Sequence, residues 1–221
     1  MKGSEILSHV DHTLLKPTAV WSQIQELCQE AIKYKTASVC IPASYVAPVH
    51  NEFGDKLNIC TVIGFPLGYD TTETKITAAT QAVADGAKEV DMVINITDAK
   101  NGDWEKITDE ISTIKAAVGN NILKVIIEAC YLTEEEKKQL CRCVTQAKAD
   151  YIKTSTGFGT GGATHEDIKL FRDNIGPKVK MKAAGGIRTI EDMKQYLAEG
   201  CDRIGASAAV GLLKDKLNTE L

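Results

Sequence analysis

The chain has 221 residues, 43% of them hydrophobic and 25% charged, which is the composition of a globular protein with enough apolar material for a full core. A net charge of -4, with basic residues dispersed along the chain, excludes the electrostatic footprint of a nucleic-acid-binding protein. No apolar run approaches the roughly 20 residues of a membrane span and residues 1–5 lack a signal peptide's apolar region, so we expect a cytoplasmic protein with no membrane partner.

Strand-like and helix-like segments alternate along the whole chain after a short first helix at residues 3–9. The strand-like segments are apolar on both faces, which is typical of a parallel sheet covered by helices. We expect the strands, in chain order, at residues 9–16, 38–41, 59–63, 89–95, 123–128, 150–153, 179–182 and 203–205. Apolar residues recur at helical spacing between them, most clearly in the stripe of Ile107, Ile111, Ile114 and Val118.

Capping patterns mark the start of four of the intervening helices. In each, an aspartate or threonine that can accept a backbone hydrogen bond stands three residues before an acidic residue. The pairs are Asp70 and Glu73, Thr133 and Glu136, Thr164 and Asp167, and Thr189 and Asp192. The helix that Asp70 opens is expected to run to Gly86, and the last helix to contain Val210, Leu213 and Leu217.

Eight alternations of strand and helix in ~220 residues predict a closed (β/α)8 TIM barrel. We expect one domain over residues 1–221, with the short N-terminal helix as an addition. An open, doubly wound sheet is the alternative, but no G-x-G-x-x-G motif follows the first strand, which favours the barrel. In such a barrel the functional site lies at the carboxyl ends of the strands.

Lysines at the ends of two successive strands are the strongest chemical signal. Lys153 precedes a turn rich in hydroxyl groups and glycine, and Lys182 precedes Gly185 and Gly186. A single strand lysine most often faces solvent, but two at the same edge of a barrel indicate one site. Because nearby cations disfavour each other's charged form, one amine is pushed toward neutrality and becomes a nucleophile for carbonyl carbon. The pair therefore predicts a Schiff-base enzyme.

Strand parity predicts that four charged side chains point into the barrel. Asp91, Lys124, Lys153 and Lys182 form this set of three cations and one anion, which is costly to bury unless it has a catalytic use. Asp91 either anchors a lysine or relays protons with Lys182 through water. Lys180 shares the face of Lys182 near the bottom of the barrel, where it must reach water or pair with an acid.

Glycine- and hydroxyl-rich turns follow the sixth, seventh and eighth strands. They contain Gly157, Gly186, Gly205 and Ser207, and the last helix is expected to begin at Ser207. Backbone amides in such turns, together with a helix N-terminus, form a phosphate cradle, and TIM barrels often place one after strands seven and eight. The turns predict a phosphorylated ligand.

The sequence predicts no metal and no cofactor. His9 and His12 could form half of a metal site in a barrel hydrolase, but no further histidine falls at a strand end. The seven cysteines are an odd number in a chain too long for a disulfide scaffold, so we expect them to be reduced and mostly buried. Cys40 either faces the strand-end site or is a small buried hydrophobe, and Asp11 either lines the pocket or is structural.

Five segments, in order along nearly the whole chain, resemble the deoxyribose-phosphate aldolase family. They are TVIGFPLG at 61–68, EVDMVIN at 89–95, KVIIE at 124–128, YIKTSTGF at 151–158 and KAAGGIRT at 182–189. The resemblance implies a (β/α)8 barrel and a class I aldolase without a metal. It also implies reversible cleavage of 2-deoxyribose 5-phosphate to glyceraldehyde 3-phosphate and acetaldehyde, a place in deoxynucleoside breakdown, and a homo-oligomer, specifically a dimer.

The resemblance also implies roles for individual residues. Lys153 matches the Schiff-base nucleophile, Lys182 the lysine that perturbs it, and Asp91 the acid and base of the proton relay. Lys124 matches an electrostatic support, and Cys40 and Asp11 are expected to support the same site. Phosphate would be held by Gly157, Gly186, Gly205 and Ser207.

Two departures from the family pattern affect these roles. Ala208 stands where a second serine is common, and residues 217–221 contain no tyrosine that could shuttle a proton, so we expect water to serve that step. Two other readings stay open: another phosphosugar barrel, such as a metal-dependent epimerase or an isomerase, and a catalytically inactive phosphosugar-binding barrel. The first explains the phosphate turns without the two lysines, and only an assay separates the second from an active enzyme, because every chemical group is present.

Overall fold

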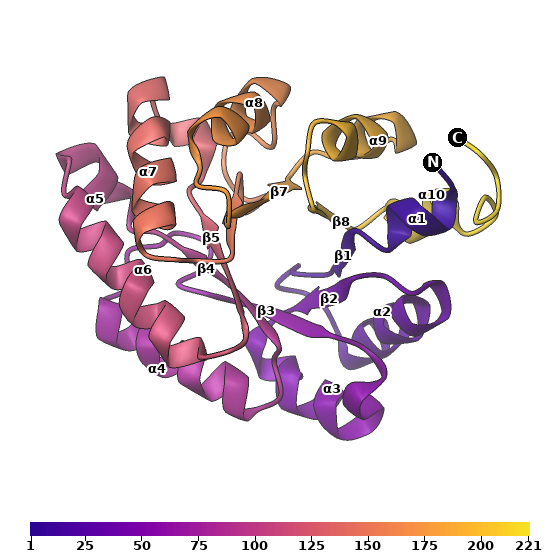
Figure 1. Cartoon of the computed structure of the whole chain (residues 1–221). Helices are drawn as coiled ribbons and strands as arrows, with labels where there is room; N and C mark the ends of the chain where they lie inside the picture. The colour runs from indigo at the N-terminus through magenta and orange to yellow at the C-terminus, as the bar shows by residue number, and fades with distance from the viewer.

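Eight parallel strands close into a barrel in the computed structural model, which describes residues 1–221 (Figure 1). The strands are β1 (Val10–Thr13), β2 (Ser38–Ile41), β3 (Ile59–Ile63), β4 (Glu89–Val93), β5 (Ile122–Ile126), β6 (Tyr151–Lys153), β7 (Lys180–Ala184) and β8 (Arg203–Ala206). Each strand pairs with the next along the chain, and β8 pairs with β1, so the sheet has no free edge. The predicted (β/α)8 barrel is confirmed.

Helices surround the barrel on its outer side (Figure 1). They are α1 (Gly3–Leu7), α2 (Trp21–Tyr34), α3 (Val46–Phe53), α4 (Thr72–Ala84), α5 (Ile96–Asn101), α6 (Trp104–Val118), α7 (Glu134–Gln146), α8 (His165–Asn174), α9 (Ile190–Ala198) and α10 (Ala209–Leu213). The extra helix α1 packs against α10, which brings the two ends of the chain together. None of these helices is both long and apolar enough to cross a membrane.

The apolar core lies between the strands and the helices. The stripe of Ile107, Ile111, Ile114 and Val118 on α6 is fully buried there, as its spacing predicted. All seven cysteines are free thiols and six are buried, which also agrees with the prediction. The space inside the strand ring is different, because charged side chains from strands on opposite sides of the barrel meet in it.

Three of the four predicted helix caps are confirmed. Thr133, Thr164 and Thr189 each accept a hydrogen bond from the backbone N–H three residues on, at 3.3, 3.1 and 3.0 Å. The prediction for Asp70 is wrong, because the extended residue before α4 is Thr71, whose hydroxyl accepts from the Thr74 N–H at 3.3 Å. The helix ends at Ala84, two residues before Gly86.

Other boundaries also differ from the sequence predictions. The fourth strand ends at Val93, because Asn95 caps an unexpected helix, α5, by accepting from the Thr97 N–H at 3.1 Å. The last helix begins at Ala209 and not at Ser207, and it ends at Leu213, so Leu217 lies beyond it. Glu128 lies beyond β5 in a left-handed backbone conformation, and therefore does not continue the strand face of Lys124.

Lys180 reaches water, as expected for a lysine at the bottom of the barrel. Its side chain is 56% exposed, and its Nζ lies 3.9 Å from Asp202 and 5.8 Å from the ring centre of Tyr151. The partner that the sequence did not indicate is therefore Asp202, which follows α9.

Candidate active site

The barrel interior holds a cluster of charged side chains from six strands. Its members are Asp11, Glu89, Asp91, Lys124, Lys153, Lys182 and Arg203. The four side chains predicted to point inward all do so, but the set was incomplete, because the interior contains four cations and three carboxylates. Glu89 could have been found by parity, since it precedes Asp91 by two residues on β4.

Asp91 is the centre of this cluster. Its Oδ2 accepts hydrogen bonds from Lys153 Nζ at 2.7 Å and Lys182 Nζ at 2.8 Å, and its Oδ1 accepts from Lys124 Nζ at 2.9 Å. Complete burial opposes the charge of Asp91, but the Coulombic attraction of Lys124, Lys153 and Lys182 holds its pKa well below the ordinary value. Asp91 is therefore an anion at neutral pH that joins the two strand-end lysines.

Lys182 has a second carboxylate partner, which keeps it charged. Its Nζ lies 2.5 Å from Asp11 Oδ2, in addition to its contact with Asp91. Burial disfavours the ammonium form, but Asp11 and Asp91 outweigh it and raise the pKa of Lys182. The pKa of Asp11 is lowered in turn, because Lys124, Lys182 and Arg203 overcome the effect of its own burial. Asp11 thus supports the site from the interior and does not line a pocket.

Lys124 and Arg203 form a deeper layer of the same cluster. Lys124 is fully buried, and its Nζ lies 2.6 Å from Glu89 and 3.6 Å from Asp11. These carboxylates and Asp91 overcome the effect of burial and raise the pKa of Lys124 well above its ordinary value. Arg203 binds Glu89 through two bonds of 2.9 Å and Asp11 through one of 2.6 Å. Both cations therefore stay charged.

Lys153 differs from these cations in two respects. Asp91 is the only carboxylate within ion-pair distance of its Nζ. It is also the only member of the charged cluster that lines the cavity at the strand ends, which has a volume of about 550 Å³. Lys182 and Asp91 do not line this cavity. Asp91 contacts Lys153, and Lys182 contacts Asp91. A ligand in the cavity would meet Lys153 first.

The predicted phosphate turns line the same cavity. Gly157, Gly186, Gly205 and Ser207 all contribute to its wall, as does Ala208. Gly157 and Gly186 have φ angles of +86° and +77°, and a Cβ atom at either position would point into open space. Glycine adopts this conformation at no steric cost, which leaves the backbone N–H groups accessible to an anion. The turns and Lys153 therefore form one site.

Several cavity residues were not predicted. Lys16, after β1, and Arg188, after β7, bring two further positive charges to the wall. Phe158 also lines the cavity and packs edge-to-face on Phe65, with ring centres 5.4 Å apart. These side chains lie on loops, where the alternation of side chains along a strand does not predict which way they point. For Phe158 and Arg188, the only signal in the sequence is that they stand next to the glycine-rich turns.

Cys40 is buried and does not line the cavity. Its Sγ, the Sγ of Cys60 and a carboxylate oxygen of Asp91 all lie within 4.8 Å of one another, which is a ligand set of the kind that binds a metal ion. The Asp91 oxygens already accept bonds from three ammonium groups, so this donor set is electrostatically unsuited to a cation. His12 binds Glu30 at 2.8 Å and is a structural residue.

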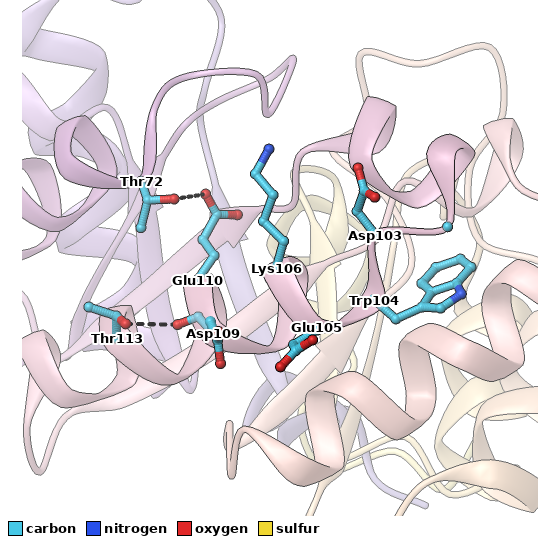
Figure 2. A pocket seen from close by; sticks show the side chains of 9 residues that line it. Thr72, Asp103, Trp104, Glu105, Lys106, Asp109, Glu110 and Thr113 are labelled. Carbon is cyan, nitrogen blue, oxygen red and sulfur yellow. Dashed lines mark hydrogen bonds between the residues drawn. The ribbon is translucent and has the colours of Figure 1, made fainter.

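A second and larger hollow lies on the outer surface of the barrel. Figure 2 shows it beside the start of α6, where its volume is about 850 Å³. Its wall is mainly acidic, and Glu110 there accepts a hydrogen bond from Thr72 at 3.1 Å. No strand-end residue lines this hollow, so its size does not make it the candidate site.

Comparison with known proteins decides the family. The model of the DeoC/LacD family aldolases matches residues 6–215. The chain belongs to this family.

Relatives in the family extend along nearly the whole chain. A deoxyribose-phosphate aldolase of Clostridium botulinum is 64% identical over 214 residues, which cover 97% of each chain. One of Clostridioides difficile is 52% identical over 97% of this chain and 98% of the relative. Among solved structures, the aldolase QR15 has a TM-score of 0.91 at 34% identity and covers 96% and 95% of the two chains. A tetrameric deoxyribose phosphate aldolase from Aeropyrum pernix has a TM-score of 0.88 at 29% identity, over 96% and 91%.

Proposed function

We propose that this DeoC/LacD aldolase reversibly cleaves 2-deoxy-D-ribose 5-phosphate to D-glyceraldehyde 3-phosphate and acetaldehyde through a Schiff base on Lys153. One observation carries the assignment of the nucleophile: of the interior lysines, only Lys153 reaches the cavity that the phosphate turns line. The relatives named deoxyribose-phosphate aldolase supply the substrate. A metal-dependent epimerase or isomerase would make no use of the buried lysines.

Charge balance and access to the cavity distinguish Lys153 from the other interior cations. Four cations face three carboxylates inside the barrel, so the loss of one proton makes the cluster neutral. Carboxylate neighbours raise the pKa of Lys124, Lys182 and Arg203, which keeps all three charged. Lys153 has a single carboxylate contact, and it is the lysine that a carbonyl group can reach.

The chemistry follows from a free amine at Lys153. Its Nζ adds to the aldehyde carbon C1 of the sugar, and loss of water gives an iminium ion. Removal of the proton from the C3 hydroxyl then breaks the C2–C3 bond, releases glyceraldehyde 3-phosphate and leaves the electron pair on an enamine. Protonation of the enamine carbon and addition of water return acetaldehyde and free Lys153. The cleavage therefore needs a base for the C3 hydroxyl proton and an acid for the enamine carbon.

Asp91 and Lys182 provide the base and the acid for these proton transfers. Asp91 is ionised and Lys182 is protonated at neutral pH, because their mutual contact of 2.8 Å and the contacts around them shift both pKa values in those directions. Asp91 also contacts Lys153 directly, so the relay needs no residue from the C-terminal segment. Water in the cavity would complete the path to the C3 hydroxyl.

The phosphate group would lie across the turns after β6 and β7 and the end of β8, where Gly205 lies within the strand and Ser207 follows it. Backbone N–H groups of Gly157, Gly186, Gly205 and Ser207 are its proposed donors, with positive charge from nearby Lys16 and Arg188. Ala208 brings no hydroxyl to this wall, so phosphate recognition here relies on backbone amides more than on serine side chains.

The wider setting follows from the same proposal. A protein of this activity would act in the breakdown of deoxyribonucleosides, and its composition fits a cytoplasmic enzyme. We expect a homo-oligomer, specifically a dimer, although one solved relative is tetrameric. Sedimentation equilibrium would distinguish a mass of two chains from a mass of one or four.

The test is an assay for glyceraldehyde 3-phosphate released from 2-deoxyribose 5-phosphate. We expect turnover that survives added chelator and is lost in Lys153→Met, while the variant still binds the sugar phosphate. Binding without turnover in the parent protein would instead indicate a catalytically inactive phosphosugar-binding barrel. Loss of activity on chelation, restored by zinc, would favour the metal-dependent alternative.

A further inference from the structure

The segment that follows β5 holds the loop that follows β6. Lys153 ends β6, and the next residues, Thr156 to Phe158, form part of the cavity wall. The backbone N–H of Ile127 donates to the carbonyl of Lys153 at 3.1 Å, and that of Ala129 donates to the carbonyl of Thr154 at 2.9 Å. Glu128 lies between these two contacts.

The Glu128 carboxylate is directed at one residue of that loop. It is 2% exposed, and its Oε1 accepts from the Thr156 N–H at 3.1 Å, while its Oε2 accepts from the Thr156 hydroxyl. The Thr156 oxygen in turn accepts from the Phe158 N–H at 3.0 Å. One carboxylate therefore holds both polar groups of Thr156 and, through them, the backbone on either side of Gly157.

The carboxyl group of Glu128 forms no ion pair. No lysine or arginine lies within ion-pair distance of Glu128, and it does not line the cavity. A buried carboxyl group without a cation needs other hydrogen-bond partners, and here both of its oxygens are met by donors of Thr156 in the loop after β6.

The backbone at Glu128 is left-handed, with φ at +50°. Two other non-glycine residues have positive φ, Lys35 and Lys148, but both follow the last turn of a helix, where this conformation is common. Glycine would adopt the Glu128 conformation at lower cost. The residue therefore bears backbone strain and retains a side chain whose hydrogen bonds are all to Thr156.

We propose that Glu128 is a positioning residue for the phosphate end of the site, which fixes the Thr156–Phe158 turn so that the Gly157 N–H faces the ligand. The inference rests on the proposed function for the identity of that ligand. It assigns Glu128 no contact with substrate and no proton transfer. Its effect should be large on binding of the phosphate group and small on imine formation at Lys153.

Two substitutions separate the carboxylate from the backbone strain. Glu128→Gly keeps the left-handed backbone without strain and removes both hydrogen bonds, whereas Glu128→Gln keeps an oxygen for the Thr156 N–H. We expect Glu128→Gly to raise the Kd for glycerol 3-phosphate, measured by calorimetry, by about tenfold or more, because bonds to a charged group are lost. Glu128→Gln should recover most of the affinity. The rate at which borohydride traps the imine between acetaldehyde and Lys153 should change by less than about threefold in both variants, since acetaldehyde carries no phosphate.

Thr156→Val provides an independent route to the same result if Glu128→Gly folds poorly. It preserves the shape of the side chain and removes the hydroxyl, so it should also raise the Kd for glycerol 3-phosphate. In the double variant with Glu128→Gly the two effects should not add, because both remove the same contact. Unchanged affinity in Glu128→Gly and Thr156→Val would overturn the proposal, as would additive effects in the double variant.

The outcomes also distinguish this inference from the proposed function. A parent protein that binds glycerol 3-phosphate but never forms a trapped adduct contradicts the Schiff-base function alone. Equal loss of phosphate affinity and of trapping in Glu128→Gly would mean that the residue maintains the whole site, which contradicts a role specific to the phosphate loop. A parent that does not bind glycerol 3-phosphate overturns the positioning role.

Discussion

At the scale of single residues, Lys182 is a fixed positive charge beside Lys153. Both nitrogens contact the same oxygen of Asp91, at 2.8 and 2.7 Å, and Asp11 adds a second negative partner to Lys182 alone. Two ammonium groups about 4 Å apart at an effective dielectric constant near 20 repel by ~4 kcal/mol. Lys182 therefore places a second positive charge beside the Lys153 amine, and we propose that this charge makes the amine reactive.

Replacing Lys182 with methionine should remove this repulsion and keep most of the apolar stem. Three cations would then face three carboxylates, so the cluster would be neutral only with Lys153 protonated. We expect acetaldehyde trapping at pH 7 to slow by about 100-fold, and its pH midpoint to rise by about two pH units, since each unit corresponds to 1.36 kcal/mol. The measurement is the borohydride trapping rate as a function of pH, which does not depend on the later proton transfers.

Lys180→Met is the matched control for this experiment. Lys180 lies two residues earlier on the same strand, but its side chain is 56% exposed and its acidic partner is Asp202. The control should leave both the rate and the midpoint of trapping unchanged. A midpoint that also stays constant in Lys182→Met would mean that burial or Lys124 controls the amine.

At the scale of elements, the start of α4 has two candidate cap residues, Asp70 from the sequence pattern and Thr71 from the structure. Thr71→Ala should destabilise the protein by about 1 kcal/mol, because the Thr74 N–H loses its acceptor. Asp70→Ala should change the free energy of unfolding by less than about 0.5 kcal/mol, since the residue is exposed and caps nothing. Urea unfolding of the two variants checks this, and a larger loss in Asp70→Ala would restore the cap that the sequence suggested.

Most helices and strands were predictable because their signals are local. Periodicity located the stripe on α6, and threonines three residues before an acid located three helix starts. Lys75 is a residue whose position local sequence patterns do not predict. It is fully buried on α4, where it donates to the carbonyl of Val93 and to Glu110, and both partners are distant in sequence. No pattern around Lys75 distinguishes it from a solvent-facing helix lysine.

At the scale of the whole molecule, the interior cluster was only half predictable. Parity placed Asp91, Lys124 and Lys182 inside, because side chains alternate along a strand. It did not reveal that Arg203 on β8 binds Glu89 on β4, since those strands lie on opposite sides of the barrel and are never paired. The contacts that set the charge balance depend on closure of the barrel, which a strand pattern does not describe.

The interior cluster also predicts how stability depends on pH. The pKa values of Asp11 and Asp91 are lowered by folding, so their contribution is complete above the unfolded value of about 3.9 and is lost as the pH falls below it. The pKa values of Lys124 and Lys182 are raised, so their contribution is complete below about 10.4 and is lost at higher pH. Between these limits these four groups should add no pH dependence to the free energy of unfolding.

Asp91→Asn isolates this contribution. The variant should be less stable than the parent by about 3 to 5 kcal/mol at neutral pH, because three buried ammonium groups lose a shared carboxylate. The difference, from urea unfolding, should stay constant from about pH 5 to 9 and shrink below about pH 4. A difference that shrinks between pH 5 and 7 would contradict a lowered pKa for Asp91.

The central claim is that Lys153 is the residue that reacts, and the most direct measurement is peptide mass mapping after treatment with acetaldehyde and borohydride. Reduction of the imine should leave one ethyl group on Lys153, and Lys153→Met should take up none while Lys180→Met is labelled like the parent. An ethyl group on Lys182 or Lys124 instead, or an active protein with no adduct on Lys153, would contradict the account.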